Sequence, residues 1–281
     1  MQLYCVEDRQ APFIDAFVQS STNYGFSPKV IAPNSSENLA YARFRQVYRH
    51  LSINPEAFEL ACFRRYFEVA TMVQEGERFI IADSDLLLNA GPADLPTIFM
   101  DQTNVLVGSI GRSSGTLESD ISPHFSFWTP TLLRQFVDYL IHAYESQDSR
   151  LEHIYRKRQD AGNKRAAISD MTLLHLFMQD ESIAFIDSNQ VVEGLLIDHN
   201  FCMTECANAT FKMNFGFKAF HRERQILRFT TTTDESVRPV AIHLQGRAKI
   251  ASQPLLQGND LSARMRLGSL SAARIARAWL V

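Results

Sequence analysis

Two short groups of residues in this 281-residue chain could act together on a phosphorylated substrate. The first is Asp83-Ser-Asp85, which directly follows the apolar run Phe79–Ala82. Ligands of open α/β sheets bind at the carboxyl ends of strands. Side chains two residues apart in an extended chain point to the same side, so the two carboxylates could share Mg²⁺ or Mn²⁺ bound to phosphate. Because the spacing is common, a turn in which Asp83 caps backbone amides explains it equally well.

The second group begins with the last residue of another apolar run, 240–243, and reads His243-x-x-Gly246-x-x-Lys249. Imidazole is a suitable ligand for Mn²⁺ as well as Zn²⁺. A glycine lets the backbone approach a phosphate closely, and the compact charge of a lysine suits a diphosphate oxygen. Each residue alone is more often structural, but their joint occurrence with Asp-x-Asp favours a site for a metal and a diphosphate.

In these two motifs the sequence resembles glycosyltransferases of the GT-A fold, namely the glycogenin-like and lipooligosaccharide galactosyltransferase-like enzymes of the nucleotide-diphospho-sugar transferase superfamily. Further resemblance lies in Cys62-Phe-Arg64-Arg65-Tyr-Phe, His124-Phe-Ser-Phe-Trp128 and Ser169-Asp170-Met-Thr-Leu-Leu, so that it covers most of residues 40–250. It implies metal ligation by Asp83, Asp85 and His243, and contact of Asp83, Gly246 and Lys249 with the donor diphosphate.

The reaction that this resemblance implies is transfer of a sugar from a nucleoside-diphosphate sugar, such as a UDP-sugar, to an acceptor hydroxyl on a cell-surface glycan or glycolipid. Mn²⁺ or Mg²⁺ would be the cofactor. A nucleotidyltransferase or a metal-dependent phosphohydrolase also uses paired aspartates, although the glycine-rich loop typical of such enzymes is missing near the N-terminus. A non-catalytic protein that binds nucleotide sugars is the third alternative.

Other polar residues have both a functional and a structural interpretation. Arg64 or Arg65 could reach the nucleotide or the second carboxylate, or could pair with Glu68 on the surface of a helix. Asp170 opens a predicted helix, where the helix dipole alone explains an acidic residue. In the enzymes that the sequence resembles, a residue at this helix start faces the sugar or the acceptor, which makes Asp170 the candidate catalytic and substrate-binding residue.

The aromatic segment after the glycine- and serine-rich loop 108–115 offers a platform for a sugar. Its rings are more often part of a hydrophobic core, because aromatic side chains contribute most when they are buried. We expect His124 to be the more exposed residue and, together with Trp128, to bind the acceptor.

The elements that must position these residues alternate in the manner of an α/β protein. Predicted strands cover 3–6, 29–32, 79–82, 105–109, 183–186 and 240–243. Predicted helices cover 55–74 and 131–145, and a third begins at Ser169 with its hydroxyl as cap. Residues 146–168 are charged and predict a loop. The sequence thus predicts a GT-A, Rossmann-like mixed sheet flanked by helices over residues 1–252, followed by a basic amphipathic tail at 253–281.

The composition of the chain limits the classes of molecule that it could bind. The formal net charge of −3 and the pI of about 6.2 provide no overall field for gripping nucleic acid. No signal peptide and no apolar run of about 18 residues is recognisable, which predicts a cytoplasmic protein. The arginine-rich tail could lie on the inner face of a membrane, although a solvated helix face is the commoner interpretation. Cys202 and Cys206 lack a second ligand pair for zinc, so idle thiols are expected.

Overall fold

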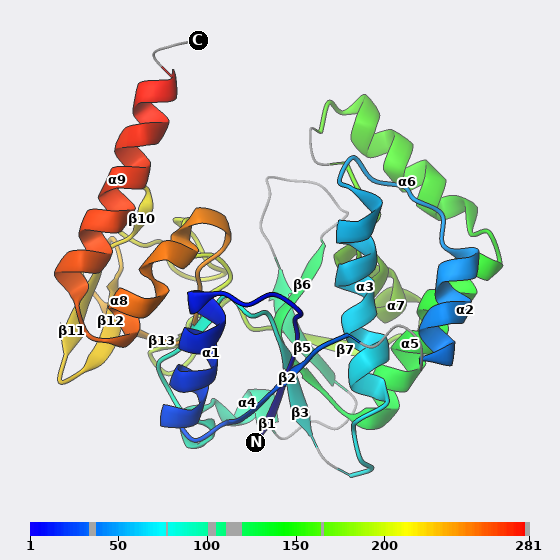
Figure 1. The fold of residues 1–281 in the computed structure, drawn as a ribbon, viewed down its shortest axis with the longest axis horizontal. Helices are drawn as coiled ribbons and strands as arrows, with labels where there is room; N and C mark the ends of the chain where they lie inside the picture. The colour runs from blue at the N-terminus through cyan, green and yellow to red at the C-terminus, as the bar shows by residue number, and fades with distance from the viewer. Residues whose placement is uncertain (34–37, 77, 101–104, 111–119, 164–165, 279–281) are drawn as a thin grey trace.

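The computed structural model describes residues 1–33, 38–76, 78–100, 105–110, 120–163 and 166–278, with only the backbone described beyond residue 271. Its main sheet contains six strands in the order β2-β1-β3-β6-β5-β7 (Figure 1). Strand β6 runs antiparallel to both of its neighbours, whereas the pairs β1–β2, β1–β3 and β5–β7 are parallel. The predicted α/β fold with a mixed sheet is therefore confirmed. The strands are β2 (Ser27–Ile31), β1 (Gln2–Val6), β3 (Phe79–Ala82), β6 (Ile121–Trp128), β5 (Val105–Ile110) and β7 (Ala184–Asp187).

A second sheet packs beside the main one and has five strands, with β8 paired to β13 outside the path β11-β12-β13-β4. These strands are β4 (Leu86–Leu88), β8 (Leu195–Ile197), β11 (Phe220–Glu223), β12 (Ile226–Thr230) and β13 (Ser236–His243), and a separate hairpin joins β9 (Met213–Asn214) to β10 (Phe217–Lys218). The predicted strand 240–243 is the end of β13, so the second informative motif belongs to this sheet.

Helices cover one face of the main sheet, and the second sheet covers the other (Figure 1). Alternate residues of β3 divide between the two faces. Ile81 faces the helices, whereas Ile80 packs with Phe17 and Leu88 on the opposite side. The covering helices are α2 (Leu39–Val47), α3 (Glu56–Ala70), α5 (Pro130–Glu145), α6 (Ser149–Asp160) and α7 (Asp170–Asp180), while α1 (Pro12–Asn23) lies on the side of the second sheet; a short helix η1 (Pro92–Asp94) and α4 (Thr97–Met100) follow β4.

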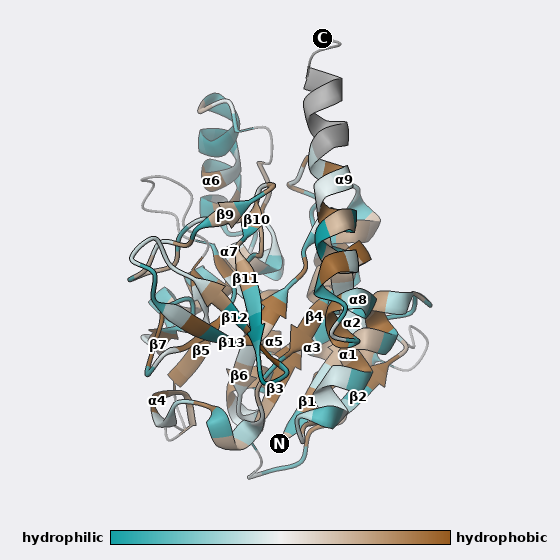
Figure 2. Cartoon of the chain, turned by 90° about the vertical axis from the view of Figure 1, so that its left-hand side faces the viewer, coloured by the Kyte–Doolittle hydropathy of each residue, from teal (hydrophilic) through white to brown (hydrophobic). Residues whose placement is uncertain are grey.

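The predicted loop at 146–168 is wrong, because it contains helix α6. Asp148 caps this helix by accepting a hydrogen bond from the backbone N–H of Arg150 (2.9 Å). Only Leu151 and Ile154 are buried, so the apolar stripe is narrow and the helix is mostly hydrophilic (Figure 2). The predicted cap at Ser169 is correct in position only: its carbonyl, not its hydroxyl, accepts hydrogen bonds from the first turn of α7.

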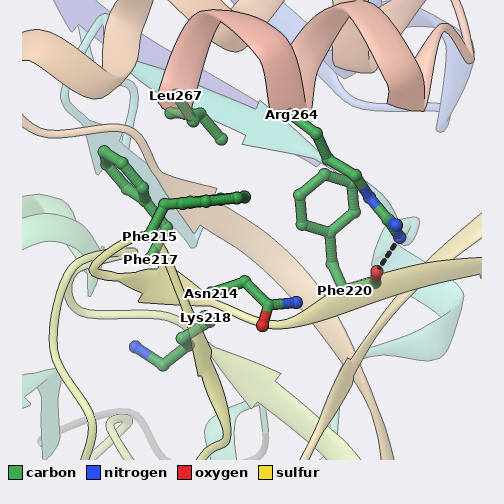
Figure 3. Close-up of a pocket in the computed structure, with 7 residues that line it drawn as sticks. All are labelled: Asn214, Phe215, Phe217, Lys218, Phe220, Arg264 and Leu267. Carbon is green, nitrogen blue, oxygen red and sulfur yellow. Dashed lines mark hydrogen bonds between the residues drawn. The ribbon is translucent and has the colours of Figure 1, made fainter. Parts of the chain in front are cut away.

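The C-terminal segment consists of a short helix η2 (Gly246–Ala251), α8 (Ser252–Leu256) and α9 (Asp260–Ala278). Ala263 and Leu267 of α9 are buried in one hydrophobic cluster with Leu244. Arg264 donates a hydrogen bond to the carbonyl of Phe220 (2.6 Å) at the edge of a pocket between α9 and the β9–β10 hairpin (Figure 3).

The first turns of α9 are thus anchored on the second sheet, and this part of the tail provides no support for membrane contact. Arg266 likewise donates to a backbone carbonyl, that of Ile250 (3.1 Å). The domain boundary at residue 252 stays a prediction. Among the described residues, no helix is both long and apolar enough to cross a bilayer.

Candidate functional site

The Asp-x-Asp segment connects the two sheets, and each of its three residues is hydrogen-bonded to a different strand or to the residue directly after one. The backbone N–H of Asp83 donates to the carbonyl of His124 in β6 (2.8 Å). The hydroxyl of Ser84 donates to Glu7, directly after β1 (2.7 Å), and the carbonyl of Asp85 accepts from Leu244, directly after β13 (3.0 Å). The two acidic side chains are therefore fixed where the carboxyl ends of β1, β3 and β13 meet.

The three predicted metal ligands lie together. One potential ligand atom from each of Asp83, Asp85 and His243 falls within 4.8 Å of the others. The Nε2 atom of His243 lies 3.2 Å from Oδ1 of Asp85 and 3.8 Å from Oδ2 of Asp83. The convergence expected from the sequence is thus present, whereas ligation of an ion stays a proposal. Cys202 and Cys206 are not disulfide-bonded and lie outside this group.

The orientation of the His243 ring suits a metal ligand. Its Nδ1 lies 2.6 Å from the carbonyl oxygen of His199. A carbonyl only accepts, so Nδ1 carries the hydrogen, and in the neutral ring the lone pair of Nε2 faces the two carboxylates. Burial alone would lower the pKa of His243, but the hydrogen bond and negative charge of Asp85 raise it to about 9. In the metal-free protein a proton on Nε2 therefore takes the position that a cation could fill.

The set of donors fits a divalent cation. Two carboxylates and one imidazole suit Mn²⁺ and also Mg²⁺, which prefers oxygen ligands and keeps several waters or phosphate oxygens. The side chain of Asp83 is 28% exposed, whereas that of His243 is 4% exposed. The group is therefore open to a ligand on the side of Asp83 and closed behind His243.

Lys249 adds a positive charge beside the acidic pair. Its ammonium lies 3.1 Å from Oδ2 of Asp85 and 4.6 Å from the centre of the Phe13 ring, and its side chain is 25% exposed. Gly246 is the first residue of the same short helix, η2, that carries Lys249. Gly246 has a left-handed backbone (φ +63°), and no atom lies within 4 Å of the position of a Cβ there. A side chain at residue 246 would be strained, although the space around this position is open.

Arg65, and not Arg64, reaches the acidic pair. Its guanidinium donates a hydrogen bond to Oδ1 of Asp83, and its Nε lies 3.8 Å from Oδ2 of Asp170. Arg64 instead binds Glu68 (2.8 Å) and packs on the ring of Tyr41, as its structural interpretation predicted. The assignment of Arg64 to the nucleotide has no support from this geometry, because the two side chains leave helix α3 on different faces.

Asp170 lies on the other side of Arg65 from Asp83. It is only 3% exposed and accepts a hydrogen bond from the hydroxyl of Tyr66 (3.0 Å). Burial raises the pKa of Asp170, although the charge of Arg65 opposes the rise. Arg65 thus links the candidate catalytic carboxylate to the candidate metal ligands.

The expectation that His124 is exposed is wrong. It lies on central strand β6, where both faces of the sheet are covered, and has no exposed surface. Its ring stacks on that of His243, with 4.6 Å between centres and 4° between planes. Trp128 is buried as well, in the core with Tyr66, and its indole N–H donates to Ser126 (2.7 Å). Neither side chain has surface for an acceptor, and most of the loop 108–115 lies outside the described residues.

Several residues around the group are missing from the sequence-based candidates. Glu7 holds Ser84, and the ring of Phe13 contacts the Lys249 ammonium. Burial alone would raise the pKa of Glu7, but hydrogen bonds from Arg9 and Ser84 lower it to about 2. The position of Glu7 directly after a predicted strand was the available signal, since ligands gather at such ends.

Comparison with protein-family models finds no match, and comparison with curated proteins finds none either. Among solved structures, an active-site mutant of LgtC aligns with 92% of this chain and 96% of its own, at 11% identity and a TM-score of 0.47. LgtC in complex with donor and acceptor sugar analogues is named as a galactosyltransferase. Mouse xyloside xylosyltransferase 1 aligns over 66% of this chain and 83% of its own, at 10% identity and a TM-score of 0.42.

A third similar protein is a glycosyltransferase involved in the glycosylation of the major capsid of PBCV-1. It has 13% identity and a TM-score of 0.31, and the alignment covers 51% of this chain and 66% of that chain, just under two thirds of its length. These names belong to the class of enzyme that the motifs resemble. With TM-scores below 0.5, however, the likenesses are weak, and the functional conclusion rests on the geometry of the site.

Proposed function

We propose that the chain is a metal-dependent glycosyltransferase that moves a sugar from a nucleoside-diphosphate sugar to an acceptor hydroxyl. The observation that carries the proposal is the convergence of Asp83, Asp85 and His243, with Lys249 beside them, at the junction of the two sheets. This arrangement supports a site for one divalent cation next to a fixed ammonium group, which is the chemistry that a diphosphate requires.

Asp83, Asp85 and His243 would hold Mn²⁺ or Mg²⁺, which when bound neutralises charge on a departing nucleoside diphosphate. Lys249 would supply a second positive charge to the same leaving group, because its side chain is partly exposed and stands next to Asp85. The open space around Gly246, in the same short helix as Lys249, would let the diphosphate approach the backbone closely.

Asp170 is the proposed residue for contact with the sugar or with the acceptor hydroxyl. It would act as base, as nucleophile or as a hydrogen-bond acceptor that fixes a hydroxyl. Arg65 would hold it at a set position relative to Asp83, because the guanidinium lies between the two carboxylates. By the same proposal, the donor is a UDP-sugar and the acceptor a glycan or lipid-linked glycan in the cytoplasm.

The test is a thermal-shift screen of nucleotide sugars with and without Mn²⁺, followed by measurement of nucleoside diphosphate released. A ligand that binds only the native state raises its stability. We expect Asp85→Ala to abolish the Mn²⁺-dependent shift and to retain the fold, and Asp138→Ala, on the exposed face of α5, to behave as the wild type.

Equal activity in chelator and in Mn²⁺ would contradict the metal role. Release of pyrophosphate from nucleoside triphosphates, without turnover of nucleotide sugars, would favour the nucleotidyltransferase alternative. Firm nucleotide binding with no turnover of any donor would identify a binding protein.

A further inference from the structure

A four-residue segment, Asp198 to Phe201, surrounds His243 on the side away from Asp85. The carboxylate Oδ2 of Asp198 accepts a hydrogen bond from the backbone N–H of His243 (3.3 Å), and the carbonyl of His199 accepts from its ring (2.6 Å). The N–H of Phe201 donates to the carbonyl of His243 (3.0 Å). We call this segment the histidine cradle. It fixes both the backbone of His243 and the direction of its imidazole.

The cradle also supports the ring that stacks on His243. The Nε2 atom of His124 lies 3.1 Å from the carbonyl oxygen of Asp198. Because His124 and His243 stack face to face, Asp198 restrains the imidazole of His243 from behind as well as along its backbone. A shift of this one residue would therefore change two contacts of the candidate metal ligand.

Lys218 holds the cradle in place. Its ammonium donates to Oδ1 of Asp198 (2.8 Å) and to the carbonyl of Asn200 (2.6 Å). It points away from the pocket beneath α9 that other atoms of the residue line (Figure 3). The side chains of Lys218 and Asp198 are 2% and 0% exposed, so this is a fully buried ion pair.

A buried ion pair is a poor means of stabilising a fold. Removing both charges from water costs about as much as their attraction returns, and an apolar pair of similar volume is often equally stable. The rings of Phe211 and Phe229 already surround the ammonium, at 5.2 and 5.9 Å, and would pack equally well on an apolar side chain. What the ion pair adds is a fixed position for the two oxygens of Asp198.

We propose that Asp198 and Lys218 are positioning residues for His243, acting through the cradle to set its geometry as a metal ligand. The inference rests on the proposed function, since it assumes that His243 binds a divalent cation. It adds two residues to the site that contact neither the metal nor the substrate.

The two oxygens of Asp198 permit a sharp test. Asp198→Asn replaces one of them by an amide group that can only donate. With Lys218 present, the ammonium takes the remaining oxygen, and the amide faces the N–H of His243. We expect the affinity for Mn²⁺ alone to fall about 10- to 100-fold, the range for losing an outer partner of a metal ligand.

Adding Lys218→Met should restore the affinity. The oxygen of residue 198 is then free to accept from His243, and the amide can donate to the carbonyl of Asn200 in place of Lys218. A structural role alone predicts the opposite order, with the double variant weaker than the single one. A second comparison removes both buried charges and changes only the oxygen of residue 198. That oxygen is present in Asp198→Asn/Lys218→Met and absent in Asp198→Leu/Lys218→Met.

Free Mn²⁺ is measured by electron paramagnetic resonance, and circular dichroism checks each fold. Arg222→Met/Asp260→Asn is the control, because it removes an ion pair of 3.0 Å that has no contact with the cradle. The inference would be overturned if Asp198→Asn and Asp198→Leu/Lys218→Met both bound Mn²⁺ with wild-type affinity. It would also be overturned if Asp198→Asn/Lys218→Met did not recover the affinity lost in Asp198→Asn. Failure of the wild type to bind Mn²⁺ would instead overturn the proposed function.

Discussion

Binding of Mn²⁺ to the metal-free protein should release one proton, and that proton should come from Nε2 of His243. Burial alone would lower the pKa of this imidazole, but Asp85 raises it to about 9, so the ring is protonated at neutral pH. Hydrogen bonds and charges from His243 and Lys249 overcome burial and lower the pKa of Asp85, which therefore has no proton to release. A metal ion that coordinates Nε2 must displace its proton.

The magnitude follows from the rise in the pKa of His243 from 6.5 to about 9. This rise corresponds to about 3 kcal/mol of stabilisation of the protonated ring, which a metal ion must exceed. Because one proton competes with one ion below pH 9, the dissociation constant of Mn²⁺ should fall about tenfold between pH 7 and pH 8.

Calorimetric titration in buffers with different protonation enthalpies counts the protons released. His243→Gln is the matched variant, since it keeps a polar side chain without a titrating group, and it should bind Mn²⁺ more weakly with no proton released. A wild-type affinity that does not change between pH 7 and pH 8, or release of no proton, would refute ligation through Nε2.

Three further predictions concern the same site. In chelator, the proton on His243 stabilises the folded protein, and this contribution is complete below pH 6.5 and is lost as the pH rises through about 9. The free energy of unfolding in urea should therefore decrease by about 3 kcal/mol over that interval. The decrease should be absent in His243→Gln. Lys249→Met removes a cation beside Asp85, so calorimetry should find Mn²⁺ bound at least as tightly, while a UDP-sugar binds about 10- to 100-fold more weakly because a charged hydrogen bond is lost. Asp170→Asn should reduce kcat at least about 100-fold, as loss of an acid or base does, with the affinity for Mn²⁺ close to the wild-type value; a normal kcat would exclude Asp170 from the reaction.

The sequence was sufficient to predict five strands of the main sheet, but not its central strand β6. Short apolar runs with polar ends predicted β1, β2, β3, β5 and β7. Strand β6 is buried over its whole length, but Ser122, Pro123 and His124 interrupt the apolar run that identified the other strands. Missing β6 led to the wrong expectation of an exposed His124.

The candidate site, too, could be predicted only in part from the sequence. Motif spacing was enough to select Asp83, Asp85 and His243, because each ends or follows a recognisable strand. The choice between Arg64 and Arg65 stayed open because both residues lie outside the apolar stripe of α3, and that stripe does not show which of the two points toward Asp83. Asp198 and Lys218 carry no local signal, since their pairing depends on how the β9–β10 hairpin packs against the segment that follows β8.

The anchoring of Asp83 by β6 and of Asp85 by the end of β13 has a mechanical consequence. An ion shared by these carboxylates and His243 would act as a further cross-link between the two layers, in addition to their apolar contacts and the hydrogen bond between His124 and the carbonyl of Asp198. Amide hydrogen exchange in β3 and in β13 should then slow together when Mn²⁺ is present, because opening either layer would break the same link. Affinity for the ion would in turn report how firmly the two layers are joined.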